Sequence, residues 1–183
     1  MKGVIASLCL TTLIAGCAGS STVTVGGRPV SIPTDAAEEH EKLIESIGIY
    51  DDPELQAYID EIGARLVANS SMPDQEFTFT LLDSPDINAF ALPGGLIYIN
   101  RGLLAYLDSE AELAGVIAHE IGHITERHHS RRKTQTITNQ IAAVSAGILT
   151  GSGDLVDAVS MYGAEVISGF GRDMELEADA AGA

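Results

Sequence analysis

One helix signal limits what this chain of 183 residues can fold into. Ser109 and Glu112 have the spacing of a helix capping box. Apolar residues then recur with a helical period, at Leu113, Val116, Ile117, Ile121 and Ile124. The stripe predicts a helix that packs against a core, yet the same segment contains His119-Glu120-Ile121-Gly122-His123. Polar side chains in such a helix are costly to bury unless they bind something.

The spacing of the two histidines points to a metal ion as the bound group. His119 and His123 are four residues apart, so both imidazoles project from one helix face and can reach one ion. Glu120 lies between them and points to the open side of that ion. Zinc held there lowers the pKa of its bound water to about 7, and Glu120 can then act as general base and acid in peptide hydrolysis.

A second helical pattern, near the end of the chain, offers the third protein ligand that zinc needs. Glu175 and Asp179 are also four residues apart and share a helix face. Glu175 can therefore ligate the metal, while Asp179 accepts the second ring N–H of a ligand histidine. Glu177 points about 160° away from that pair. The alternative is a solvated acidic helix that pairs with Arg172 or with lysines.

The remaining histidines are expected away from the metal. On an ideal helix His128 and His129 are rotated by about 180° and 280° from His119, which directs them away from the metal face. With the neighbouring arginines they predict a solvated helix end. His40 stands in an acidic stretch and is expected at the surface.

Other periodic segments indicate an α+β fold in which helices dominate. One helix is expected over residues 35–47, and another begins at the N-cap Asp52 and Pro53 and ends near Asn69. Three short strands are predicted, over residues 77–81, 87–92 and 96–100. The first of them alternates apolar and polar residues and should be half-buried. Together they predict a small sheet between helices.

Residues 134–168 are apolar at helical spacing and are interrupted by Gly151-Ser152-Gly153. Two core helices joined by a loop are one interpretation. The other is that the glycine-flanked loop lets this segment act as a lid over the metal cleft or as a surface for unfolded proteins. The sequence leaves both open.

The N-terminus has the layout of an exported lipoprotein. Residues 1–16 combine a positive start, a short apolar run and small residues, as in a secretory signal peptide. Ile14-Ala15-Gly16-Cys17 resembles the bacterial lipobox, whose cysteine is lipidated, although an ordinary signal peptide with an incidental cysteine is the alternative. Ala18, directly after this cysteine, then implies sorting to the outer membrane of a Gram-negative cell.

A tether is expected between the anchor and the folded body. Residues 17–34 are rich in serine, glycine and proline, which predicts a flexible segment. A strand at residues 22–25 is the alternative. The folded domain is expected over residues 35–183.

Composition bears on partners and on stability. The chain has 10 Lys+Arg against 26 Asp+Glu, a formal net charge of -16, so its surface would repel nucleic acid. Its 45% apolar content is enough for a buried core. Cys9 would leave with the signal peptide and Cys17 would carry the lipid, so no disulfide is expected and the core and a metal would supply stability.

Several sequence blocks resemble, in their order along the chain, the BepA/LoiP/HtpX-type zinc metallopeptidases, which are gluzincins. The blocks are Asn88 to Gly95, Gly102-Leu103-Leu104, Glu112-Leu113-Ala114, His119 to His123 and Glu175 to Asp179. The resemblance covers about residues 40–182 and is greatest to the soluble lipoprotein branch. It implies a zincin-like domain with one zinc per chain, held by His119, His123 and Glu175.

The resemblance also assigns roles around the metal. Glu120 is implied as general base and acid, and Asp179 as the partner of a ligand histidine. The implied edge strand that aligns substrate contains Asn88, Ala89 and Phe90. Relatives continue with further helices, and one branch adds a repeat domain. We therefore expect the domain to be incomplete at its C-terminus, with the oxyanion donor beyond Ala183.

The activity implied by the resemblance is zinc-dependent endoproteolysis of misfolded or misassembled cell-envelope proteins, in outer-membrane protein quality control. The implied location is the periplasmic face of the outer membrane, with outer-membrane assembly machinery as a possible partner. A non-proteolytic, metal-stabilised chaperone or assembly factor is the alternative.

Overall fold

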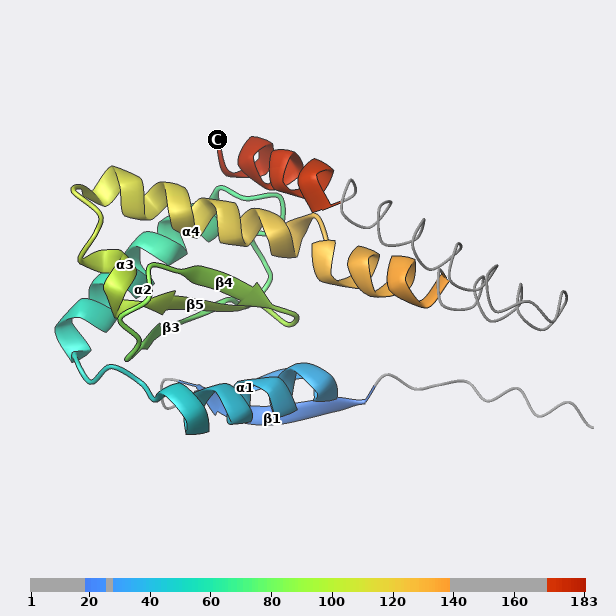
Figure 1. Ribbon diagram of the computed structural model, residues 1–183, viewed down its shortest axis with the longest axis horizontal. Coiled ribbons are helices and arrows are strands. Elements are labelled where there is room, and N and C mark those ends of the chain that lie inside the picture. Colours follow the sequence, from blue (N-terminus) through green and yellow to red (C-terminus); the bar gives the residue numbers. More distant parts are fainter. Residues whose placement is uncertain (1–18, 26–27, 139–170) are drawn as a thin grey trace, which may run out of the picture.

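The computed structural model describes residues 19–25, 28–138 and 171–183 (Figure 1). The expected signal peptide over residues 1–16 and the lipidation residue Cys17 lie outside the described residues, as does the 139–168 part of the expected helix pair or lid. Within the described ranges, no helix is both long and apolar enough to cross a membrane.

The segment expected to be a flexible tether forms a β-hairpin over most of its length. β1 (Ser20–Val25) pairs antiparallel with β2 (Arg28–Pro33). Val23, Val30 and Ile32 are buried, because alternate residues of both strands face the same side. The tether expectation was wrong for residues 20–33, since it weighed serine, glycine and proline content above this alternation of buried residues.

Two helices follow the hairpin at the positions that the sequence indicates. α1 spans Thr34–Ile47 and α2 spans Pro53–Ala68. The predicted cap of α2 is present, since Asp52 Oδ1 accepts a hydrogen bond from Leu55 N at 3.0 Å. The C-cap residue is Asn69.

A three-stranded sheet lies at the centre of the domain. It contains β3 (Thr78–Leu82), β4 (Ala89–Leu92) and β5 (Leu96–Asn100) in the order β3-β5-β4. β3 runs parallel to β5, and β4 runs antiparallel to it. β4 is therefore an edge strand, and within the described ranges no other strand pairs with its outer edge.

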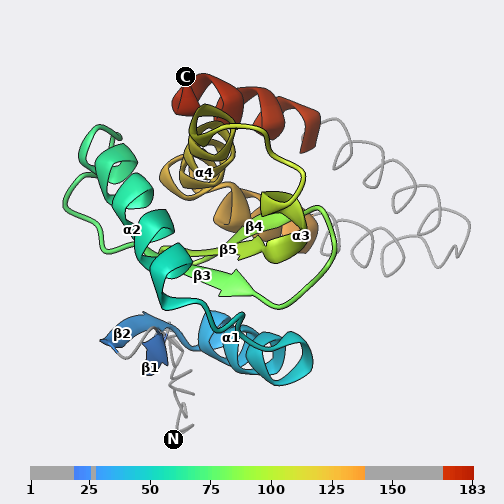
Figure 2. The same cartoon turned by 90° about the vertical axis from the view of Figure 1, so that its left-hand side faces the viewer.

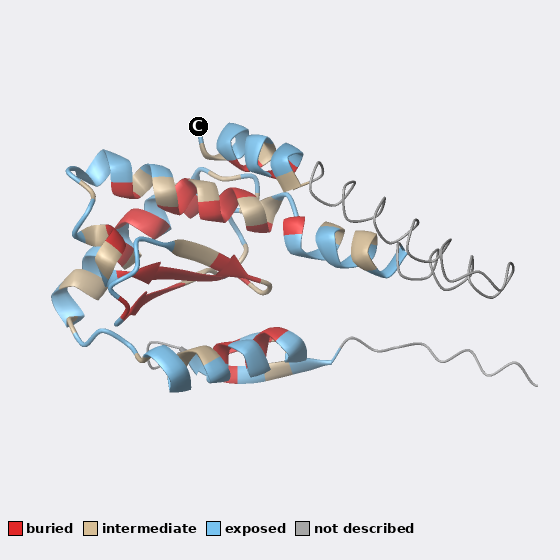
Figure 3. Ribbon diagram, viewed as in Figure 1, coloured by how far each residue is buried: buried red, intermediate tan, exposed pale blue. Residues whose placement is uncertain are grey.

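Both faces of this sheet are covered, as Figure 2 shows. One face packs against α2 and α4, and the other packs against the hairpin and α1. β3 was expected to be half-buried, but four of its five residues are buried (Figure 3). The expectation was wrong because Phe79 and Leu81 enter one apolar cluster while Leu82 enters the other.

The helical part of the domain begins with α3 (Arg101–Leu104) and α4 (Glu110–Thr125). The capping of α4 is as predicted, since Ser109 Oγ accepts from Glu112 N at 3.3 Å. A turn at residues 126–127 separates α4 from a helix whose described part covers residues 128–138. A last helix, over residues 171–182, lies alongside α4 in Figures 1 and 2. The predicted α+β class with a small sheet is confirmed.

One histidine expected at the surface belongs to the interior. His40 is only 6% exposed, and its Nδ1 lies 2.6 Å from the Tyr98 hydroxyl oxygen. Burial lowers the pKa of His40. The expectation was wrong because acidic neighbours in sequence occupy the other face of α1, while His40 shares the inward face with Ala36 and Ala37.

Candidate metal centre

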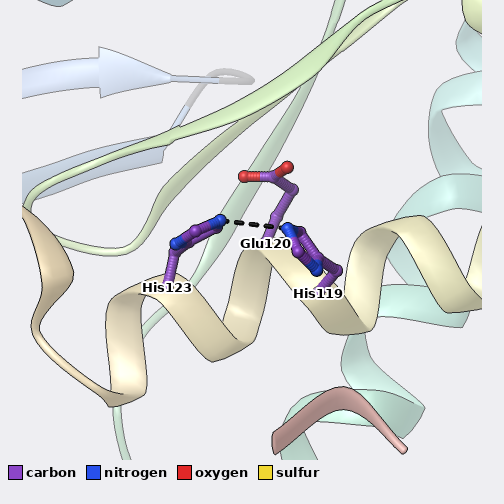
Figure 4. Close-up of side chains that lie close together, drawn as sticks. All are labelled: His119, Glu120 and His123. Atoms are coloured by element: carbon purple, nitrogen blue, oxygen red, sulfur yellow. Dashed lines mark hydrogen bonds between the residues drawn. The ribbon is translucent and has the colours of Figure 1, made fainter. Parts of the chain in front are cut away.

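α4 places three polar side chains together next to the sheet. One possible ligand atom from each of His119, Glu120 and His123 lies within 4.8 Å of the others. Figure 4 shows the two imidazole rings facing each other, with the Glu120 carboxylate on the side of the sheet. The Nε2 atoms of His119 and His123 are 3.0 Å apart. The i, i+4 geometry expected from the sequence is therefore present.

The helix over residues 171–182 completes this arrangement. Met174 and Ala178 are fully buried and hold the helix against the rest of the domain. Glu175 Oε2 lies 3.3 Å from His119 Nε2 and 3.6 Å from His123 Nε2. Asp179 Oδ1 lies 2.8 Å from His119 Nδ1. Residues about 55 positions apart in sequence thus meet at one point, as the pattern of the two helices predicted.

The spacing of these atoms fits a tetrahedral metal site. Two ligands at about 2.0–2.1 Å from one tetrahedral zinc ion lie about 3.3 Å from each other. The separations among His119 Nε2, His123 Nε2 and Glu175 Oε2 run from 3.0 to 3.6 Å. Two imidazole nitrogens and a carboxylate oxygen are a donor set that suits a divalent transition metal. The three residues can therefore hold such an ion without rearrangement.

Burial shapes the protonation of two groups in the site. Burial raises the pKa of Glu120 to about 7, and the nearby Glu175 carboxylate also raises it while His119 lowers it. For His123, burial lowers the pKa to about 4. His123 is therefore a neutral imidazole at neutral pH, which is the form that binds metals.

A cleft of about 270 Å³ opens beside these residues. The edge strand β4 contributes Ala89, Phe90 and Ala91 to its lining, and the two helices of the site contribute His119, Glu120 and Glu175. Asn88, expected with Ala89 and Phe90, does not belong to the cleft lining among the described residues, and its carbonyl oxygen accepts from Asn100 N at 3.0 Å.

At alternate residues, β4 directs backbone groups to its outer edge and not to β5. Because Asn88 bonds to Asn100 and the register pairs Phe90 with Tyr98, the even-numbered residues of β4 bond to β5. The N–H and C=O groups of Ala89 and Ala91 therefore point away from β5.

His128 contradicts the expectation of a solvated helix end. Its side chain is 3% exposed, and its Nδ1 lies 2.8 Å from His123 Nδ1. The expectation was wrong because it extended α4 as an ideal helix. α4 ends at Thr125, and Arg127 takes a left-handed conformation with φ of 55°, which turns the chain back toward the site.

Two neighbours of His128, also expected at a solvated end, reach the cleft. His129 and Arg132 belong to its lining. Burial lowers the pKa of His129. A hydrogen bond to the Ala91 backbone raises this pKa and so partly offsets the effect of burial. The left-handed residue could not be predicted from the sequence, because arginine has no preference for that conformation.

The comparison with known families covers most of the chain. Residues 53–183 match the model of the family described as peptidase family M48. This range includes α2, the central sheet and every residue of the candidate metal centre.

Individual relatives match shorter stretches. The beta-barrel assembly-enhancing protease of Yersinia pestis is 48% identical over 80 residues, which is 44% of this chain and 16% of the relative. The protein of that name from Escherichia coli K12 is 42% identical over 86 residues, or 47% and 18% of the two chains. Mitochondrial metalloendopeptidase OMA1 of Schizosaccharomyces pombe is 33% identical over 123 residues, or 67% and 36%. The matched segment thus spans less than a fifth of each bacterial relative.

Proposed function

Because the chain belongs to peptidase family M48, we propose that it is a zinc-dependent endopeptidase with one zinc ion per chain. The observation that carries the proposal is the meeting of His119, His123 and Glu175 beside a buried Glu120. Zinc is preferred over other divalent ions because this set of two histidines and one glutamate is a common donor set of catalytic zinc sites.

Each residue of the site has a defined task in this proposal. His119 Nε2, His123 Nε2 and Glu175 Oε2 hold the zinc. Bound there, the ion would lower the pKa of a water molecule and polarise the scissile carbonyl. Glu120 accepts a proton from the attacking water on its carboxylate and later delivers it to the leaving amine. Asp179 accepts the Nδ1–H of His119, which leaves the Nε2 lone pair directed at the metal.

The environment of Glu120 suits this exchange of a proton. Glu120 is 8% exposed and borders the cleft. Burial raises its pKa to about 7, close to the pH at which a general base must both accept and release a proton.

The edge of β4 supports binding of an extended peptide. A substrate strand laid along β4 can bond to the outward N–H and C=O groups of Ala89, which lines the cleft. Backbone pairing gives affinity with little sequence preference, so any unfolded or misassembled polypeptide can bind. Cell-envelope proteins are the proposed substrates, because the bacterial relatives are named for β-barrel assembly.

Arg132 is the proposed donor to the developing oxyanion. Among the described residues that line the cleft, it is the only permanent cation. A guanidinium in the lining of this cleft can stabilise negative charge on the carbonyl oxygen. Arg132 is thus proposed in place of the donor expected beyond Ala183.

The test of the proposed function is hydrolysis of an unfolded protein substrate. We expect the purified protein to cleave it, to lose cleavage on treatment with a zinc chelator, and to regain it on addition of one equivalent of zinc. Glu120→Gln is the control, since it removes the base and keeps every metal ligand. Cleavage that survives both the chelator and Glu120→Gln would exclude this site. Zinc binding without any cleavage would favour a metal-stabilised chaperone or assembly factor.

The proposed location is the periplasmic face of the outer membrane, with residues 1–16 as signal peptide and a lipid on Cys17. The lipobox-like sequence supports the anchor, and the bacterial relatives support the Gram-negative envelope. Outer-membrane assembly machinery is a proposed partner at that surface. Expressed in a Gram-negative host, wild type should fractionate with outer membranes and Cys17→Ser should not. Equal fractionation of the two would refute the anchor.

A further inference from the structure

A series of hydrogen-bonded side chains, buried at His128 and half-exposed at Glu177 and Arg131, lies behind His123. His128 Nδ1 lies 2.8 Å from His123 Nδ1, on the opposite side of the ring from Nε2. His128 Nε2 lies 3.2 Å from Glu177 Oε2. Arg131 bonds to both oxygens of Glu177, with Nη2 to Oε1 at 3.3 Å. We propose that His128 is a positioning residue for the metal ligand His123, and that Glu177 and Arg131 fix the tautomer of His128.

The direction of each hydrogen bond follows from the role of His123 as a metal ligand. His123 must direct the lone pair of Nε2 at the ion, so its single ring proton is on Nδ1. His123 Nδ1–H then donates to His128 Nδ1, which must be an acceptor. The proton of His128 is consequently on Nε2, from which it donates to Glu177. The position of the ring proton is thus fixed in both His123 and His128, and the lone pair of His123 Nε2 is available to the metal.

Glu177, the acidic residue that bonds to His128, stabilises this arrangement of protons. The Glu177 carboxylate accepts from His128 Nε2–H, and Arg131 donates to both of its oxygens, which favours the charged carboxylate. The other tautomer of His128 would present an N–H to His123 and a lone pair to Glu177. Both contacts would then be lost or repulsive.

The two ligand histidines thus have matched supports. His119 donates from Nδ1 directly to Asp179, and His123 donates from Nδ1 to His128. Asp179 and Glu177 both belong to the helix over residues 171–182. That helix therefore supplies a proposed ligand, Glu175, and also orients both histidines of α4.

The local fold shows why His128 occupies this position. The left-handed Arg127 ends the helical path of α4, and Arg127 O accepts from Arg131 N at 3.0 Å in the first turn of the next helix. This turn places His128 five residues after His123 yet in contact with its ring. A continuous helix would have directed it elsewhere.

The experiment compares His128→Leu with His128→Asn in the full chain. Leucine removes the acceptor, whereas the asparagine Oδ1 can accept near the position of Nδ1. We expect His128→Leu to weaken zinc binding by about 10–100-fold in competition with a chelator. His128→Asn should recover at least half of that loss on a logarithmic scale. Thermal unfolding of the metal-free proteins separates this effect from a general loss of stability.

Glu177→Leu provides an independent variant if His128→Leu does not fold. It removes the acceptor of the His128 proton from a half-exposed position, and we expect a smaller loss of zinc affinity, about 3–10-fold. The inference is overturned if His128→Leu binds zinc within twofold of wild type. If only Glu177→Leu folds, the same result in that variant overturns it. No recovery in His128→Asn relative to His128→Leu would also overturn it.

The inference rests on the proposed metal site, and the two can fail separately. If wild type binds no zinc, the proposed function fails. If wild type binds zinc and the His128 variants bind it equally well, only the positioning role fails. The readout is zinc affinity, so it does not depend on proteolysis.

Discussion

A Cβ atom added to Gly122 would stand 2.8 Å from the carbonyl oxygen of Ala178. The backbones of α4 and of the helix over residues 171–182 therefore touch in the middle of the site. Gly182 makes a second such approach, where an added Cβ would lie 2.9 Å from the Ala118 carbonyl carbon. This contact brings Glu175 within reach of His119 and His123.

Gly122→Ala tests the close approach. The methyl group must displace backbone, so we expect the two helices to separate, zinc affinity to fall by about tenfold or more, and the melting temperature to fall. Gly115→Ala is the matched control on α4, since an added Cβ there meets nothing within 4 Å. In that variant the higher helix propensity of alanine should raise stability by about 0.5–1 kcal/mol. Unchanged zinc affinity in Gly122→Ala would mean that the approach is not needed for the site.

The proposed ligand set predicts that substitutions of ligands and of their neighbours differ in their effect on zinc binding. His119→Ala, His123→Ala and Glu175→Ala should each abolish stoichiometric zinc binding, because each removes one of three protein ligands. Asp173→Ala, an exposed change on the same helix as Glu175, should retain one zinc per chain. Metal analysis after dialysis measures both. Retention of zinc by Glu175→Ala would require a different third ligand.

The features that the sequence predicts correctly are those set by residues close together in the sequence. The caps at Asp52 and Ser109, the strand at residues 96–100 and the histidine pair of α4 all follow from spacing within one turn or one strand. Glu175 was predicted to lie near the histidine pair because zinc needs a third protein ligand, and the structure places it there.

Three of the wrong expectations depend on features that have no signal in the neighbouring sequence. His128 was misplaced because one left-handed residue, Arg127, redirects the chain. His40 was misplaced because Tyr98, 58 positions away, supplies its buried partner. β3 was misjudged because a second layer, the hairpin with α1, covers the face expected to be exposed.

Glu120→Gln separates metal binding from chemistry and also predicts a pH effect. The variant should retain zinc and lose peptide hydrolysis, because it lacks the proton acceptor but keeps the ligands. In the metal-free protein, burial raises the pKa of Glu120 to about 7, whereas an unfolded glutamate titrates near about 4.3. The folded state thus holds this proton more tightly, so its stabilising contribution is complete below about pH 4 and is lost as the pH rises through about 7.

The measurement is urea unfolding of the two metal-free proteins between pH 4 and 8. The free energy of unfolding of wild type relative to Glu120→Gln should fall by on the order of 3 kcal/mol over that range. Burial lowers the pKa of His123, so its contribution to the free energy of unfolding changes with pH in the opposite sense, but His123 is present in both proteins. A difference that does not change with pH would contradict the raised pKa.

Arg132→Gln tests the proposed oxyanion donor. Removing one such donor from a hydrolase typically lowers kcat by about 100–1,000-fold. We expect a loss of that order with zinc still bound, because Arg132 lines the cleft but is not a ligand. Arg127→Gly is the control, since it removes a nearby arginine that lies outside the described lining of this cleft and places glycine at a positive φ. A kcat equal to wild type in Arg132→Gln would leave the oxyanion without an assigned donor.

Ala89→Pro tests whether substrate binds along the outer edge of β4. The outward N–H of Ala89 is not used by β5, so proline removes a donor to substrate and preserves the pairing of β4 within the sheet. We expect slower cleavage of an unfolded protein, mainly through a higher KM, with zinc binding and melting temperature close to wild type. Phe90→Pro is the contrasting variant, because the backbone of Phe90 bonds to β5 and its loss should lower the melting temperature as well. If Ala89→Pro cleaves unfolded chains with an unchanged KM, substrate does not pair with this strand and must bind through side-chain contacts elsewhere in the cleft.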